Sequence, residues 1–144
     1  MSTGTFAVGL VACASRKLQR PAPARDLYVS PLFKKASAFA ESSCVRWYVL
    51  SAKHRLVHPD TVLEPYDQRL SGSRASAANQ EWADMVRKQL EDELNGVENI
   101  TLLALAGEQY RTILRDVPWP YEVPMQGLGI GQQLGWLTRK LAEA

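Results

Sequence analysis

The chain has 144 residues, of which 46% are hydrophobic and 22% are charged. This composition is typical of one globular domain spanning residues 1–144 and excludes a disordered chain. Two cysteines and a net charge of +2 exclude a disulfide scaffold and a strongly charged tail. Because the longest apolar run is too short to span a bilayer and no signal peptide is found, we expect a cytoplasmic monomer without a membrane partner.

Apolar runs predict the strands, and apolar residues at helical spacing predict the helices. Buried strands are expected at 6–13, 45–50 and 100–105, and an edge strand at 121–124. Helices are expected at 31–41, 77–94, 108–115 and 130–142. Strands that alternate with helices indicate an α/β fold, here a single three-layer sandwich with a mostly parallel four-stranded sheet flanked by helices.

A long polar stretch at 51–76 follows the second strand, and a loop of this length in a small domain is usually functional. Its carboxylates Asp67 and, as second choice, Glu64 are candidates for a general base or an electrostatic partner. Candidate hydrogen-bond donors and cations in the same stretch are Ser51, Lys53, His54 and Tyr66. His54 and His58 lack the Glu of a metallohydrolase motif, so we expect no metal and no cofactor.

Polar residues also follow the first and third strands, and parallel strands bind ligands outside their carboxyl ends. Ser15 and Lys17 are candidates to meet a phosphate or a base edge, and Tyr28 either stacks on a base or caps the core. Further candidates for substrate binding are Gly107, Gln109, Tyr110 and, in a glycine-rich turn, Gln132.

Basic residues concentrate between Ser15 and Lys35. Candidates to bind a nucleic-acid backbone are Arg16, Arg20, Lys34 and Lys35. The alternative is an ordinary solvated surface that happens to be rich in lysine and arginine. The predicted partner is a nucleic acid, and we expect DNA more than RNA.

Several short motifs together resemble a small bacterial and phage family that we associate with the uracil-DNA glycosylase-like superfamily. They are Cys13-x-Ser-x-Lys17, Ala24-x-x-Leu-Tyr28 with Phe33, Trp47 to His54, Glu64-Pro-Tyr-Asp67, Ala106-Gly-x-x-Tyr110 and Gly129 to Gln133. The resemblance runs from Val8 to Leu137, and its most specific pieces are Leu-Ser-Ala-Lys and Glu-Pro-Tyr-Asp. Two departures are the missing Gly-Gln-Asp-Pro-Tyr motif of ordinary uracil glycosylases and Arg55 in place of an expected glycine.

The resemblance implies a DNA glycosylase that removes a modified, bulky pyrimidine of the kind found in phage DNA, in defence or repair. Asp67, or else Glu64, would then orient water and stabilise the sugar cation, while Lys53 and His54 neutralise the departing base. Two alternatives are a nucleic-acid or nucleotide-binding module without activity and a glycosidase or transferase acting on free nucleosides or nucleotides.

Overall fold

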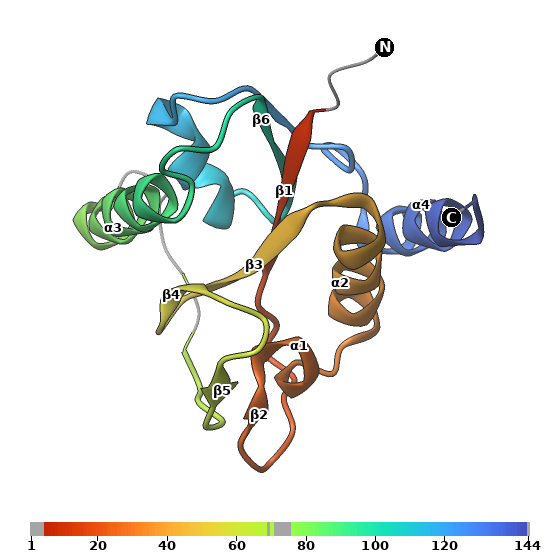
Figure 1. The fold of residues 1–144 in the computed structure, drawn as a ribbon. Helices are drawn as coiled ribbons and strands as arrows, with labels where there is room; N and C mark the ends of the chain where they lie inside the picture. Colours follow the sequence, from red (N-terminus) through yellow and green to blue (C-terminus); the bar gives the residue numbers. More distant parts are fainter. Residues whose placement is uncertain (1–4, 69, 71–75, 144) are drawn as a thin grey trace.

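In the computed structural model, the described residues are 5–68, 70 and 76–143, and they form an α/β fold around a five-stranded sheet (Figure 1). The strand order is β4-β3-β1-β6-β7. The strands are β1 (Phe6–Ala12), β3 (Arg46–Ser51), β4 (Arg55–Val57), β6 (Ile100–Leu105) and β7 (Tyr121–Glu122). All neighbours in the sheet pair in parallel except β4, which is antiparallel to β3. The predicted mostly parallel sheet is confirmed, but the expected count of four strands is wrong because β4 lies inside the stretch taken for a loop.

Helices cover both faces of the sheet (Figure 1). They are α2 (Pro31–Ser43) and α4 (Ile130–Glu143) on one face, and α3 (Ala77–Glu93) with the 3₁₀ helix η1 (Tyr110–Asp116) on the other. The side chains of Ser30 and Ser76 cap α2 and α3 by accepting hydrogen bonds from the backbone N–H three residues later, at 3.2 Å in each case. The predicted helices are confirmed, except that the segment expected at 108–115 is a 3₁₀ helix that begins at Tyr110.

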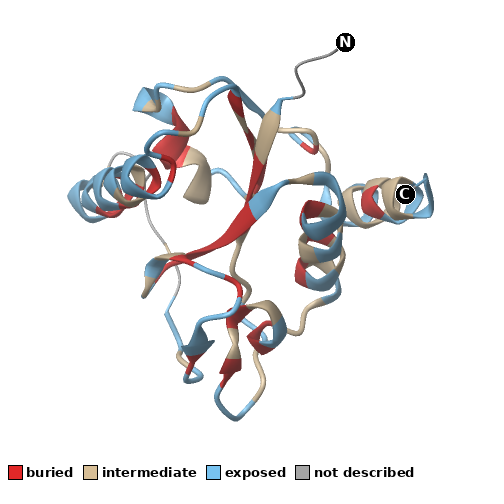
Figure 2. Cartoon of the chain, in the orientation of Figure 1, coloured by how far each residue is buried: buried red, intermediate tan, exposed pale blue. Residues whose placement is uncertain are grey.

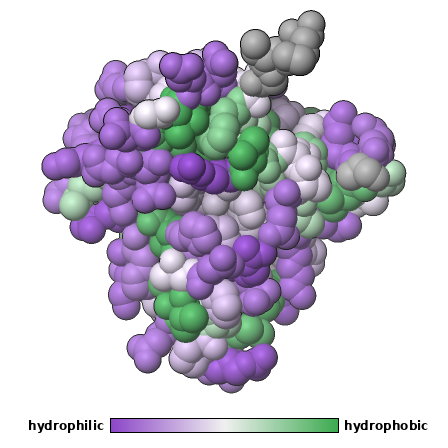
Figure 3. All heavy atoms as spheres, in the orientation of Figure 1, coloured by the Kyte–Doolittle hydropathy of each residue, from purple (hydrophilic) through white to green (hydrophobic). Residues whose placement is uncertain are grey.

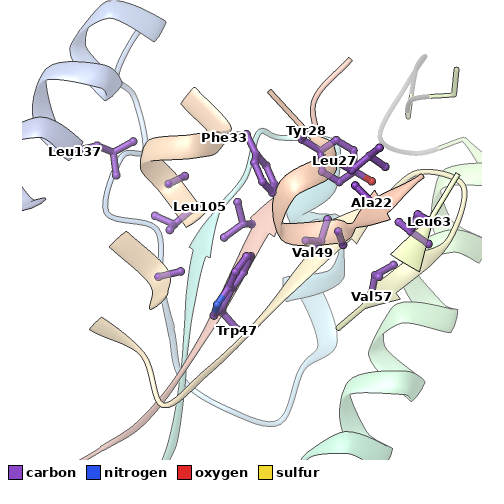
Figure 4. Close-up of a cluster of buried hydrophobic side chains, with 14 of the residues drawn as sticks. Ala22, Leu27, Tyr28, Phe33, Trp47, Val49, Val57, Leu63, Leu105 and Leu137 are labelled. Carbon is purple, nitrogen blue, oxygen red and sulfur yellow. The ribbon is translucent and has the colours of Figure 1, made fainter. Parts of the chain in front are cut away.

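The two faces of β1 explain why the sheet holds two hydrophobic clusters (Figure 2). Val8 and Leu10 point toward α3, and Val11 points toward α2, because side chains alternate along a strand. Figure 4 shows the α2 side, where Phe33, Trp47, Leu105 and Leu137 pack together from α2, β3, β6 and α4.

Helix α2 approaches the sheet closely at Gly9. A Cβ atom at this position would lie 3.1 Å from the Cβ atoms of both Ala40 and Trp47. The absence of a side chain at Gly9 therefore lets α2 sit directly on β1, which fixes the N-terminal end of α2 beside the carboxyl end of β1.

The segments after β1 and β3 are joined to each other, which was not expected from the sequence. Strand β2 (Ala22–Pro23), just before the short helix α1 (Ala24–Leu27), pairs antiparallel with β5 (Val62–Leu63). The guanidinium of Arg25 adds ion pairs to Glu41 and Asp60. The stretch at 51–68 is thus tied down by β4 and β5 rather than being one long loop; residues 69 and 71–75 of the predicted loop lie outside the described residues.

Polar residues cover most of the molecular face seen in Figure 3. Among the helices of the described residues, none has both the length and the apolar character needed to cross a membrane.

Candidate functional site

Three of the segments predicted to bind a ligand lie at one edge of the sheet. Because β1, β3 and β6 are parallel, the residues that follow them, beginning at Cys13, Ala52 and Ala106, leave the sheet at the same edge. From β1 the chain passes to β3, which pairs with one side of β1, and it later returns to β6, which pairs with the other side of β1. The strand order therefore reverses between β1 and β6, and such a reversal point is where open α/β sheets bind their ligands.

A cavity of about 690 Å³ lies at this reversal point. Its walls are the ends of β1 and β6, the first turns of α2, and the turn that leads into α4. Side chains with polar or ionisable groups on its walls include Cys13, Glu108, Gln109, Tyr110, Arg111, Gln126 and Gln133. The volume lies within the range of small-molecule pockets, and the mixture of apolar walls with a few polar groups is typical of them.

Beside this cavity, three hydroxyl groups form what we call the hydroxyl cluster: Tyr28, Ser51 and Tyr66. The Tyr66 hydroxyl lies 2.7 Å from Ser51 Oγ and 2.5 Å from the Tyr28 hydroxyl. Ser51 Oγ also accepts a hydrogen bond from the backbone N–H of His54 at 3.0 Å. Burial raises the pKa of Tyr28 to about 12 and raises the pKa of Tyr66 further, so both phenols are neutral near pH 7.

Two lysines flank the ring of Tyr66. Lys17 Nζ lies 4.4 Å from its centroid and Lys53 Nζ lies 5.9 Å from it. Lys17 is held there because the chain after β1 folds back and forms a β-bridge with Tyr28. The ring of His54 meets Tyr66 edge-on at 5.2 Å, and the pKa of His54 is lowered by its partial burial and by the charge of Lys53. His54 is consequently uncharged near pH 7.

The two carboxylates predicted to be catalytic have fewer contacts than the residues of the hydroxyl cluster. Glu64 and Asp67 are exposed, do not line the cavity, and make no hydrogen bond or ion pair within the described ranges of the chain. In those ranges, no group of three or more His, Cys, Asp or Glu side chains is arranged to hold a metal ion. The structure thus brings Ser51, Lys53, His54 and Tyr66 together but leaves the carboxylates outside the group.

The predicted binding residues after β6 do line the cavity. Gly107, Gln109 and Tyr110 are on its wall. The Tyr110 hydroxyl lies 3.3 Å from Cys13 Sγ and 3.4 Å from the backbone nitrogen of Leu70. Burial raises the pKa of Tyr110, so this phenol also stays neutral. Tyr110 therefore connects the cavity to the chain that follows the hydroxyl cluster.

Two other residues predicted to bind the substrate, Tyr28 and Gln132, do not line the cavity. Tyr28 is only 1% exposed and its ring packs on Phe33 with centroids 4.9 Å apart, so no ring face is open for a base and the stacking role is wrong. The side chain of Gln132 accepts a hydrogen bond from the Gly129 N–H at 3.0 Å. Gln133, one residue later, lines the cavity instead and donates to the Leu128 carbonyl at 2.8 Å.

The predicted backbone-binding residues do not form one cluster around the cavity. Arg16, Arg20 and Lys34 are exposed and absent from its walls, as is Ser15, which was predicted to bind the substrate. Lys35 donates a hydrogen bond to Thr138 Oγ1 at 2.9 Å, across the contact between α2 and α4. A role of these residues in binding a nucleic acid stays a prediction.

Sequence reasoning missed several residues on the cavity wall. Glu108 and Cys13 were not among the predicted site residues, yet both line the cavity. The signal for Glu108 was its position directly after Gly107, at the end of a buried strand. Gln126 and Arg111 carried no such signal, because only the folded chain brings the turn after β7 and the helix η1 to the same wall.

The family of unknown function DUF6884 matches residues 8–139. The chain belongs to this family. It is also similar to the uncharacterized protein YfjM of Bacillus subtilis (strain 168), with 27% identity over 149 residues that cover 93% of this chain and 94% of the relative. The match spans every segment that contributes to the cavity and to the hydroxyl cluster. Neither similarity carries an activity, so the glycosylase chemistry and the link to uracil-DNA glycosylases stay predictions.

Proposed function

We propose that this chain is an N-glycosylase that hydrolyses the bond between a modified pyrimidine and its sugar in DNA, with the base held in the cavity between β1 and β6. The single observation that carries the proposal is the position of this cavity of about 690 Å³ at the reversal point of the sheet, beside the lysine-flanked hydroxyl cluster. The motif resemblance to the uracil-DNA glycosylase-like superfamily supports the reaction type.

The cavity wall suits a base. Amide side chains at Gln109, Gln126 and Gln133 carry both donors and acceptors, which match the hydrogen-bonding edge of a pyrimidine. Apolar walls from Leu32 and Phe33 suit the flat faces of the base. The volume leaves room for a bulky substituent, and a base flipped out of a duplex must fit such a pocket.

Hydrolysis joins a water oxygen to C1′ of the sugar and breaks the bond from C1′ to the base nitrogen. The electron pair of that bond leaves with the base, and the proton released by water neutralises it. The neutral Tyr110 hydroxyl can donate to the departing base, because its raised pKa keeps the proton in place. The ammonium groups of Lys17 and Lys53 add positive charge at the neighbouring hydroxyl cluster, which favours an anionic leaving group or phosphate.

The carboxylate that we assign to the sugar cation is Glu108, because it lines the cavity while Asp67 and Glu64 do not. Glu108 is exposed and follows Gly107 at the end of β6, so it can reach a sugar at the cavity mouth. A carboxylate there would stabilise the oxocarbenium-like transition state and orient the attacking water.

The experiment uses duplexes that each contain one modified pyrimidine, incubated with the purified protein and then treated with alkali to cleave abasic sites. We expect strand cleavage at the modified base for at least one duplex, and none for the matched duplex with the ordinary base. The Glu108→Gln protein is the control for contaminating enzymes. If no duplex yields abasic sites at high protein concentration, the DNA glycosylase proposal is wrong.

A second candidate is a glycosidase that acts on free nucleotides. The observation in its favour is that Arg16, Arg20 and Lys34 do not line the cavity and that Lys35 is used between α2 and α4. Release of free base from a mononucleotide, without release from DNA, would identify this candidate. Charge reversal at Lys34 would then leave the rate unchanged, whereas a DNA glycosylase that uses this face would lose binding.

A further inference from the structure

A second cavity of about 360 Å³ lies next to the main one. The two share four wall residues, Glu108, Arg111, Val123 and Gln126. The two cavities therefore adjoin each other at these residues, on the side of the main cavity formed by η1 and the turn after β7. The second cavity differs in character, since two arginines, Arg111 and Arg115, line it against one carboxylate, Glu108.

Arg111 lines both cavities, and the fold leaves one of its guanidinium N–H groups unpaired within the described residues. Its Nε–H is shielded from solvent and has no hydrogen-bond acceptor within the described part of the chain. Buried polar groups in proteins are nearly always paired, so the unpaired Nε–H of a residue that lines both cavities is exceptional. Arg87 shows the contrast: it forms an ion pair with Asp84 and donates to two carbonyls of η1, at Thr112 and Ile113.

We propose that Arg111 and Arg115 form an anion subsite that binds a phosphate group of the nucleotide whose base occupies the main cavity. This proposal rests on the proposed function, because that function places a nucleotide in the main cavity. Guanidinium groups favour phosphate since their planar N–H donors match its oxygens in pairs. Neither arginine forms an ion pair with a carboxylate in the described ranges of the chain, so their charges are available.

The test follows the Nε–H signals of the arginines in a ¹⁵N-labelled protein by NMR while inorganic phosphate is added. The Arg111 signal is assigned by its absence from the Arg111→Lys spectrum. We expect this signal to shift in a saturable way with phosphate and to stay unchanged with chloride at equal ionic strength. The matched control is Arg139, an exposed arginine on α4 that lines neither cavity. If the Arg111 signal moves no more than the Arg139 signal, the subsite proposal is overturned.

Variants give a second measurement. Arg111→Gln and Arg115→Gln should each weaken phosphate binding by about tenfold, the effect of one lost charge-assisted hydrogen bond, while Arg139→Gln leaves it unchanged. Because Arg115 is exposed, we expect the Arg115→Gln protein to fold, so phosphate binding can be measured even if Arg111→Gln fails to fold. Equal binding by the Arg115→Gln variant and the parent would contradict a two-arginine subsite.

Two further ligands identify the source of the phosphate. A free mononucleotide, 2′-deoxycytidine 5′-monophosphate, is compared with a short single-stranded DNA, and each is compared with 2′-deoxycytidine. Tighter binding of the mononucleotide assigns the subsite to a free nucleotide, and tighter binding of the DNA assigns it to the strand. Phosphate binding at Arg111 without base release would leave the subsite standing and refute the proposed function. Base release at an unchanged rate in both arginine variants would support the proposed function and refute the subsite.

Discussion

The hydroxyl cluster and the main cavity lie on opposite sides of β1 at the same edge of the sheet, yet they are built in opposite ways. Two of the three cluster residues, Ser51 and Tyr66, come from one continuous stretch. The Tyr66 hydroxyl forms hydrogen bonds with both the Ser51 and the Tyr28 hydroxyl. The cavity is assembled from four separate segments, and its carboxylate, Glu108, forms no ion pair within the described residues. A region whose hydroxyls are bonded to one another stabilises the fold, whereas the exposed Glu108 carboxylate leaves the cavity with a charge that a ligand can meet.

The two regions meet at Tyr110. Its hydroxyl contacts Cys13 on the cavity wall and the backbone nitrogen of Leu70 in the chain beyond Tyr66. A change in one region can therefore reach the other through this phenol. The comparison teaches that the stretch with the most reactive side chains, 51–67, contributes no residue to the wall of the main cavity.

The largest expected effect comes from exchanging one carboxylate in each region. Glu108→Gln should lower the rate of base release by about 100-fold or more, because the transition state loses the charge that stabilises the sugar cation. Asp67→Asn should change the rate by less than about threefold, since Asp67 does not line the cavity. Single-turnover rates on the same substrate measure both. A large loss with Asp67→Asn and none with Glu108→Gln would return the chemistry to the 51–67 stretch.

The next effect concerns stability. Tyr66→Phe should lower the free energy of unfolding by about 3 kcal/mol, because the hydroxyls of Ser51 and Tyr28 both lose their partner. Urea denaturation followed by tryptophan fluorescence measures the change. Tyr121→Phe is the matched control, since Tyr121 is exposed on the edge strand β7. Equal stability of the two variants would mean that the hydroxyl cluster does not support the fold.

A pH effect of somewhat smaller size tests the same cluster. The pKa of Tyr28 is raised by burial from 10.0 to about 12, so the folded state holds this proton more tightly than the unfolded state. The resulting stability is fully present below pH 10 and is lost as the pH rises toward 12, by about 2 kcal/mol. Denaturation midpoints measured across this range should fall with pH, and the fall should be shallower in Tyr28→Phe. An identical slope in the variant would show that Tyr28 does not cause it.

Much of the fold could be predicted from sequence because the long elements carry their own signals. The apolar run of β1 and the Ser-Pro start of α2 are local, and both elements were found. Strands β4 and β5 were missed because they have three and two residues and lie among prolines and charged residues. Pairing with β3 and β2, not local preference, makes them strands.

The candidate site could be predicted only in part, for a related reason. Segments that follow parallel strands must leave the sheet at the same edge, which is why Gly107, Gln109 and Tyr110 could be expected to lie near the segment after β1, and all three line the main cavity. Which side of β1 the cavity occupies depends on the strand order β3-β1-β6, and sequence alone does not set that order. The role predicted for Asp67 rested on the residues of one motif; Asp67 does not line the main cavity, and its role stays a prediction.

The smallest expected effect is a gain in stability at Arg55, at the start of β4 beside the hydroxyl cluster. Arg55 has a φ of 66°, in the left-handed region that favours glycine, and the resembled family's motif has glycine there. The left-handed conformation costs a residue with a side chain about 1 to 2 kcal/mol. Glycine avoids that cost but loses about 0.5 to 1 kcal/mol in chain entropy.

We therefore expect Arg55→Gly to raise the free energy of unfolding by about 0.5 to 1 kcal/mol in urea denaturation. Lys53→Gly is the matched control in the same turn, because Lys53 is exposed and has an ordinary negative φ. That variant should lose stability, since it gains chain entropy in the unfolded state without relieving any strain. If both variants lose stability, the side chain of Arg55 contributes more to the β3–β4 turn than its backbone conformation costs. The stretch at 51–68 would then be stabilised by its side chains even at a position where the backbone favours glycine.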